Sequence, residues 1–201
     1  MAYINLPPDA YPGIGGLMMA YPKTGKALAN LAQQLLKEGS SLSPAERELI
    51  AARVSRANDC EFCTKAHTAA ARHQVSDDDD NIVDQVVNQQ DYSGLSEKMQ
   101  RLIDLTLAVQ QGGKFVTQTH VDQARAVGAD DQAIHDTVLI AAAFCMFNRY
   151  VDGLGTATPP DDSMYEMVGQ HLAQQGYAVG MLWQLLYRLL PKAVRNLFLS
   201  N

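Results

Sequence analysis

The sequence predicts an all-α protein that contains an internal repeat. Apolar residues recur at helical spacing along most of the 201-residue chain. No segment shows the alternating Val-, Ile- or Thr-rich pattern, bounded by turn residues, that is typical of a strand. In addition, the segment 42–78 resembles 95–131 when the sequence is shifted by 53 positions. A chain of this length can bury a sizeable core as one domain.

The first half of the chain carries clear start and stop signals for helices. Residues 1–22 are rich in proline and glycine and predict an irregular arm, which a helix over 24–37 follows. The run Ser43-Pro44-Ala45-Glu46 has the pattern of a capping box with proline at the first helical position. That helix should run to about Ala57, and Asn58-Asp59 should cap a further helix beginning at Cys60.

The second half is also expected to be helical. Helices should follow the acidic run 77–80 and Ser96, and a long apolar helix should cover 134–151. Two C-terminal helical segments are expected over 162–175 and 178–199. We therefore expect one all-helical domain over 1–201, divided into an arm (1–22), a repeat copy with the active site (42–94), a second repeat copy (95–152) and C-terminal helices (162–199).

The repeat is supported by identities that helix capping and core periodicity do not explain. Eleven of the 37 aligned pairs are identical, where ordinary residue frequencies would give about two. They include His67/His120 and Arg72/Arg125. The copies differ at Glu48/Arg101, Cys60/Gly113 and Cys63/Val116. The first copy thus holds the reactive groups, and the second is expected to be scaffold, with His120 as a structural residue.

Composition excludes several classes of function. The net charge of −6 argues against nucleic-acid binding, which needs a concentrated positive face. We find no secretion signal and no apolar run near the ~20 residues of a membrane-spanning helix, so we expect a cytoplasmic protein without a membrane partner. Cytoplasmic thiols are kept reduced. A C-x-x-C pair there indicates catalysis or metal binding, and Cys145 is expected to be a buried core residue.

Cys60, Cys63 and His67 share one stripe of the predicted helix. Positions i, i+3 and i+7 fall within about 60° of one another at 3.6 residues per turn. The helix start should lower the pKa of an exposed Cys60, while His67 can remove a thiol proton. Glu48 can orient His67 if the two helices pack antiparallel. Since a positioned base outweighs a helix dipole, we expect Cys63 to be the thiol coupled to the relay and Cys60 its partner.

Zinc binding is the main alternative for the cysteine pair. A zinc site needs a fourth ligand, and the nearest candidate, His73, lies two turns further along the same helix and out of reach. There is no second C-x-x-C. We therefore expect no metal and no cofactor, and predict a reversible disulfide between Cys60 and Cys63 with Cys145 free.

The segment LSPAERELIAARVSRANDCEFCTKAH resembles the carboxymuconolactone decarboxylase-like superfamily, specifically its alkylhydroperoxidase D-like branch. The pattern is a glutamate twelve residues before C-x-x-C and a histidine four residues after the second cysteine. It falls here on Glu48, Cys60, Cys63 and His67. The run Phe147-Asn148-Arg149-Tyr150-Val151-Asp152-Gly153 is similar to a segment of the peroxidase-related subgroup.

The resemblance implies an all-helical, internally duplicated fold that assembles as homo-oligomeric trimers or hexamers. It also implies a peroxidase in which one thiolate attacks a hydroperoxide and the other closes the disulfide. Glu48 and His67 would relay protons, and an external dithiol, such as a lipoyl-bearing protein, would restore the thiols without metal or haem. The best-studied alkylhydroperoxidases have a second histidine where this chain has Phe62, so the relay here is one group shorter.

Two other functions compete with peroxide reduction. One is a redox-sensing or disulfide-exchange protein that turns over no peroxide. The other is a lactone decarboxylase-like enzyme that uses His67 as its base, which is disfavoured because the true lactone decarboxylases of the superfamily lack the cysteine pair. Self-association is expected independently, since the segment 180–190 is apolar on nearly every face.

Overall fold

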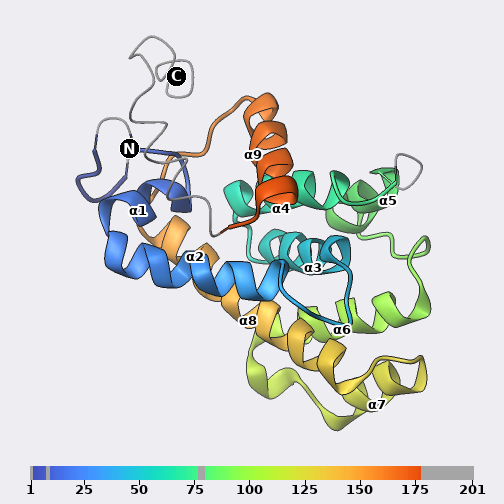
Figure 1. Ribbon diagram of the computed structural model, residues 1–201. Coiled ribbons are helices and arrows are strands. Elements are labelled where there is room, and N and C mark those ends of the chain that lie inside the picture. Colours follow the sequence, from blue (N-terminus) through green and yellow to red (C-terminus); the bar gives the residue numbers. More distant parts are fainter. Residues whose placement is uncertain (1, 8–9, 77–79, 178–201) are drawn as a thin grey trace.

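The computed structural model describes residues 2–7, 10–76 and 80–177, and this part of the chain forms helices and no strand (Figure 1). The predicted all-α class is therefore confirmed. The α-helices are α1 (Ile14–Ala20), α2 (Pro22–Leu36), α3 (Pro44–Ala57), α4 (Glu61–Arg72), α5 (Asp80–Asp84), α6 (Glu97–Gln111), α7 (Gln118–Ala126), α8 (Asp131–Gly153) and α9 (Asp162–Gln175). A π-helical turn, η2 (Gln85–Gln89), continues α5, and a 3₁₀ turn, η3 (Gly113–Phe115), follows α6.

Helix α3 begins and ends where the sequence predicts. The Ser43 hydroxyl accepts a hydrogen bond from the Glu46 amide (3.2 Å), and the Glu46 carboxylate accepts one from the Ser43 amide (2.8 Å). After Ala57 the chain reverses through three residues, in which Asp59 has a left-handed backbone (φ 57°). Cys60 is then the N-cap of α4. The hairpin of α3 and α4 is thus fixed by local signals.

Three predictions about the elements need correction. The arm 1–22 is not irregular throughout, because α1 occupies Ile14–Ala20 and buries Leu17 and Met19. Helix α7 was not predicted as a separate helix, since only Ala124 of it is buried and it has little apolar periodicity. Helix α8 begins before residue 134, because Asp130 caps it by accepting a hydrogen bond from the Ala133 amide (2.7 Å). The expected helix over 178–199, like the apolar segment 180–190, lies outside the described residues.

The two repeat copies fold alike in their first helix and differently after it. α3 and α6 are both capped by a serine, Ser43 and Ser96, whose side chains accept hydrogen bonds from the third residue of the helix. The paired core positions Leu49/Leu102 and Ile50/Ile103 are all buried. The copies diverge where Cys60–Cys63 of the first copy corresponds to the 3₁₀ turn η3 of the second. Only the first copy therefore presents a helix start carrying thiols.

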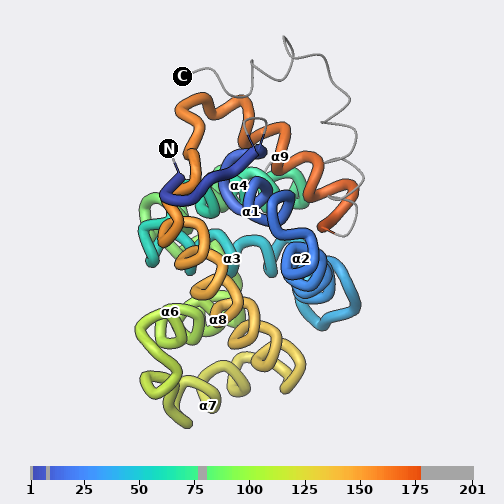
Figure 2. Tube along the Cα trace, turned by 90° about the vertical axis from the view of Figure 1, so that its left-hand side faces the viewer, coloured from blue at the N-terminus to red at the C-terminus, as the bar shows by residue number. Residues whose placement is uncertain are grey.

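Helix α3 lies at the centre of the described molecule. Every residue from Arg47 to Ser55 is buried. Seen from two directions, α4 lies on one side of α3 and α9 covers the outer face of α4, while α6 and α8 lie on the other side (Figures 1 and 2). A polar side chain on α3 that points between these helices is consequently removed from water.

The packing of α9 on α4 depends on small residues. A Cβ added at Gly169 would lie 2.4 Å from the Ala69 Cβ and 2.7 Å from the Ala70 amide nitrogen. Such distances are shorter than van der Waals contact, so glycine permits the two backbones to approach. An ion pair from Lys65 to Asp162 (3.0 Å) joins the same helices at the surface.

We predict that Gly169→Ala separates α9 from α4 and lowers the free energy of unfolding by about 1–3 kcal/mol, the usual cost of overpacking. Chemical denaturation measures this change. Gly153→Ala in α8 is the matched control, because its Cβ would meet no atom within 4 Å. Equal stability of the two variants would contradict the close approach.

Candidate active site

A buried acid–base pair joins α3 to α4. The Glu48 carboxylate is fully buried, His67 is 8% exposed, and His67 Nδ1 lies 2.7 Å from Glu48 Oε2. A carboxylate can only accept, so Nδ1 carries the hydrogen of this bond and the Nε2 lone pair of a neutral ring is left free to act as a base. The hairpin of α3 and α4 thus brings Glu48 and His67 together, the arrangement that the sequence allowed if the two helices packed antiparallel.

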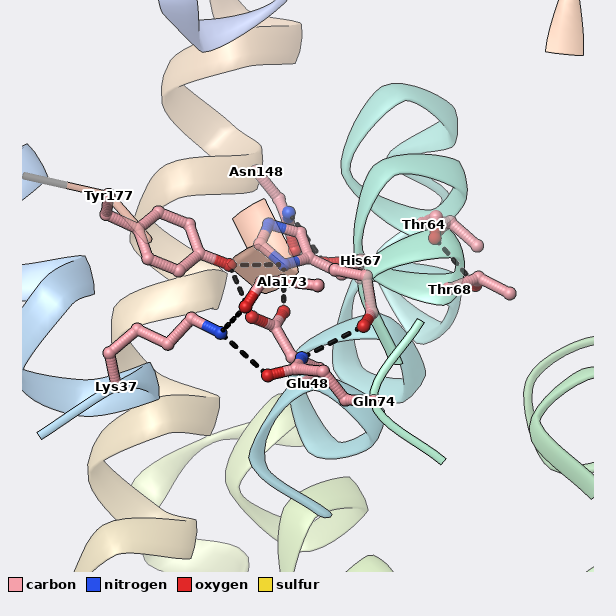
Figure 3. A network of polar contacts seen from close by, with 11 residues as sticks. Lys37, Glu48, Thr64, His67, Thr68, Gln74, Asn148, Ala173 and Tyr177 are labelled. Carbon is pink, nitrogen blue, oxygen red and sulfur yellow. Dashed lines mark hydrogen bonds and ion pairs between the residues drawn. The ribbon is translucent and has the colours of Figure 1, made fainter. Parts of the chain in front are cut away.

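Tyr177 completes this pair from a distant part of the chain (Figure 3). Its hydroxyl donates to Glu48 Oε1 (2.7 Å) and lies 3.3 Å from His67 Nδ1. Its ring stacks on the imidazole with centroids 6.1 Å apart and planes 10° apart. Phe144 of α8 contacts the imidazole edge-on at 4.6 Å. The sequence analysis missed both aromatic residues, because no local spacing links them to the cysteine motif.

Lys37 supplies positive charge beside the buried carboxylate. Its Nζ donates to Gln74 Oε1 (2.7 Å) and to the carbonyl of Ala173 (2.8 Å). Burial lowers the pKa of Lys37, while the negative charge of Glu48 acts in the opposite direction. A buried carboxylate is tolerated when charges and hydrogen bonds compensate it, and here Lys37, His67 and Tyr177 do so.

Both thiols of the C-x-x-C pair are reduced and buried, Cys60 at 0% and Cys63 at 3% exposure. They lie in an apolar cluster with Phe62, Ala66, Val151, Met164 and Tyr165. A hydrogen bond with the Cys63 side chain, together with burial, raises the pKa of Cys60. The expectation of an exposed Cys60 with a lowered pKa is therefore wrong. As the N-cap, Cys60 faces this cluster instead of solvent.

Hydrogen bonds from α6 and α8 hold the turn that starts α4. The Cys60 amide donates to the carbonyl of Ser55 (3.1 Å), and Asn148 Nδ2 donates to the Ser55 hydroxyl (3.0 Å). Asn58 Nδ2 donates to Asn148 Oδ1 (2.9 Å), and Gln110 Nε2 donates to the carbonyl of Ala57 (3.1 Å). These bonds fix the position of Cys60 relative to Glu48.

A surface pocket opens beside this turn. It is lined by Asn58, Asn148, Arg149, Asp152 and Gly153. The negative charge of Asp152, one of these residues, contributes to the raised pKa of Cys60. Four of the five lining residues, all except Asn58, belong to the segment 147–153 that the sequence analysis singled out by resemblance.

The remaining candidate residues have structural surroundings. His120 Nδ1 accepts a hydrogen bond from the Thr117 amide (3.1 Å) and caps α7, which agrees with a structural role. Cys145 packs against the main core but is only half-buried, with its sulfur 3.5 Å from Asn58 Nδ2, so the expectation that it is fully buried is wrong. Phe62 packs edge-on against Tyr165, with ring centroids 5.7 Å apart. His73 instead lies 3.4 Å from Glu166 of α9.

Residues 2–7, 10–76 and 80–177 contain no group of three or more His, Cys, Asp or Glu side chains placed to hold a metal ion. Within the same ranges no helix is long and apolar enough to cross a membrane.

Comparison with solved structures shows proteins of the same fold. An uncharacterized peroxidase-related protein from Silicibacter sp. TM1040 superposes with a TM-score of 0.66 at 24% identity, over 75% of this chain and 78% of that one. An alkylhydroperoxidase AhpD core from Ralstonia eutropha JMP134, also an uncharacterized peroxidase-related protein, gives a TM-score of 0.68 at 24% identity, over 79% and 81%. No curated protein matches the sequence.

The family model named carboxymuconolactone decarboxylase family matches this chain twice, over residues 22–94 and 83–158. Together the two matches cover more than half of the chain, and each contains one copy of the helical repeat that starts at Ser43 or Ser96. The internally duplicated fold is thereby confirmed. The chain belongs to the carboxymuconolactone decarboxylase family.

Proposed function

We propose that this chain is a thiol-dependent peroxidase that reduces hydroperoxides through a reversible Cys60–Cys63 disulfide, with Glu48 and His67 as its proton relay. The observation that carries the proposal is the buried 2.7 Å contact between Glu48 and His67. His67 lies on the same helix, α4, as Cys63. An apolar site disfavours a thiolate, so a buried thiol needs such a base. The names of the two similar structures, both peroxidase-related, are consistent with this chemistry.

In the first step, His67 Nε2 takes the proton of Cys63, and the charge of Glu48 stabilises the imidazolium that forms. The Cys63 thiolate attacks the terminal oxygen of the hydroperoxide, a sulfur–oxygen bond forms and the oxygen–oxygen bond breaks. The leaving alkoxide takes the proton from His67 and departs as an alcohol. Cys63 is oxidised to the sulfenic acid by two electrons.

In the second step, the Cys60 sulfur attacks the Cys63 sulfenic acid. A disulfide forms, the sulfur–oxygen bond breaks, and the hydroxide leaves with the Cys60 proton as water. The i, i+3 spacing at the helix start allows this bridge with modest distortion of the first turn. An external dithiol, such as a lipoyl group on a partner protein, then reduces the disulfide by exchange and is itself oxidised.

The structure favours Cys63 as the attacking thiol. The raised pKa of Cys60 keeps its proton in place, so its S–H can donate to a Cys63 thiolate. Cys63 is the third residue of α4, where unpaired amides and the helix dipole also favour a negative charge. Both effects stabilise the Cys63 thiolate, which forms when His67 takes the proton of Cys63.

We predict that the purified protein consumes hydroperoxide with dihydrolipoamide as reductant. Cys63→Ser should lower the rate at least about 100-fold, because no thiolate remains beside the base. Cys145→Ser is the matched control and should retain wild-type turnover, since Cys145 lies outside the apolar cluster around the pair.

Two results of the same assay would contradict the proposal in different ways. A disulfide that forms and is reduced without continued peroxide consumption would indicate redox sensing or disulfide exchange. A lactone-directed activity that survives loss of both Cys60 and Cys63 would indicate chemistry that uses His67 alone as a base.

We further predict that Glu48→Gln shifts the alkylation of Cys63 by iodoacetamide to higher pH by roughly one unit. Loss of the carboxylate charge destabilises the imidazolium that accompanies the Cys63 thiolate, so the thiol holds its proton to higher pH. Peptide-resolved mass spectrometry measures Cys60 and Cys63 separately. Glu97→Gln, an exposed residue of α6, is the control and should shift neither profile. A shift at Cys60 alone would indicate that Cys60 is the attacking thiol and Cys63 its partner. A shift at neither cysteine would contradict the relay from Glu48 through His67.

A further inference from the structure

Tyr177 reaches the buried pair because the chain turns sharply after α9. Gly176 ends the helix with φ 73°, a conformation that favours glycine. The Tyr177 amide then donates to Gln33 Oε1 of α2 (2.8 Å). A Cβ added at Gly176 would lie 2.5 Å from the same oxygen. The backbone before the tyrosine is thus held by α2, well outside the hairpin that carries the thiols.

The tyrosine side chain makes two separate contacts with the pair. Its hydroxyl donates to Glu48 Oε1, the oxygen that His67 does not use, and its ring lies parallel to the imidazole. Burial and the charge of Glu48 raise the pKa of Tyr177 well above its ordinary value. The hydroxyl therefore remains a donor throughout the pH range in which histidine titrates.

We propose that Tyr177 is a positioning residue of the thiol site, whose hydroxyl fixes the Glu48 carboxylate and whose ring fixes the plane of His67. The consequence of this inference for catalysis rests on the proposed function. The geometry from which it is drawn is independent of that function. Tyr177 lies beyond both segments that match the family model, which end at residue 158. It therefore comes from a part of the chain that the family model does not match.

The hydroxyl sets how strongly the pair holds its proton. A carboxylate that accepts two hydrogen bonds is a weaker base than one that accepts a single bond. Without the Tyr177 hydroxyl, Glu48 would attract the shared proton more strongly and stabilise the imidazolium. The protonated imidazole is therefore favoured in a protein that lacks the hydroxyl.

The ring has a different role from the hydroxyl. Phe144 contacts one side of the imidazole edge-on, and the Tyr177 ring lies against it in parallel. Together with the bond to Glu48, these contacts leave the imidazole one orientation. Loss of the ring should therefore slow the thiol reaction at every pH, whereas loss of the hydroxyl should move the titration of His67.

Tyr177→Phe and Tyr177→Ala separate the two roles. For Tyr177→Phe we expect the NMR titration of the His67 imidazole to move to higher pH by about one unit, as expected for loss of one hydrogen bond to a charged group. The maximal rate of peroxide consumption should stay nearly unchanged. Tyr177→Ala should lower the rate at all pH values. Tyr92→Phe is the matched control, because the Tyr92 hydroxyl accepts from Arg53 (2.8 Å) away from the site.

An unchanged His67 titration in Tyr177→Phe would overturn the inference and leave Tyr177 as a packing residue. If Tyr177→Phe does not fold, Gly176→Ala provides the second variant. It displaces the tyrosine without altering its side chain, and it should give the same upward shift. The His67 titration needs no substrate. A protein that consumes no peroxide but shows the shift would therefore refute the proposed function and retain the inference.

Discussion

The hydrogen bond between His67 and Glu48 is the interaction on which the site depends. Glu48 is fully buried on the central helix α3, and a buried charge is costly unless it is paired and hydrogen-bonded. Three separate parts of the chain meet this need, because His67 comes from α4, Lys37 directly follows α2 and Tyr177 follows α9. Removing one partner of such a pair commonly costs about 3–5 kcal/mol. The pair therefore joins α3 to α4 and, in the proposed mechanism, also prepares the base.

The duplicated fold shows what the reactive copy adds to its scaffold. Both copies bury the same apolar positions on their first helix, but the position of Glu48 in the second copy is Arg101, which is exposed. His120 then has no buried acid to meet and caps a helix instead. The proposed chemistry thus depends on few substitutions in a repeated helical pair, together with Lys37, Phe144 and Tyr177, which act on the Glu48–His67 pair from other parts of the chain.

Local signals explain why part of this arrangement could be predicted. The serine cap and Pro44 define the start of α3, and the spacing of Cys60, Cys63 and His67 places them on one stripe of a single helix. Tyr177 could not be found this way, because it lies 110 residues from His67 and meets it only through tertiary packing. The burial of Cys60 was missed for the same reason, since α8 and α9 provide its apolar neighbours. The partial burial of Cys145 could not be predicted either, because its sulfur contacts Asn58 in the turn between α3 and α4.

The pH dependence of a single turnover links the buried pair to the thiols without any reductant. Reduced protein is mixed with one equivalent of hydroperoxide, and formation of the Cys60–Cys63 disulfide is followed by quenching and mass spectrometry. We predict a rate that rises with pH, and a rise that lies at higher pH in Glu48→Gln because the imidazolium beside the thiolate loses its stabilising charge. A disulfide that forms at the same rate and with the same pH dependence in both proteins would contradict a role for the buried pair.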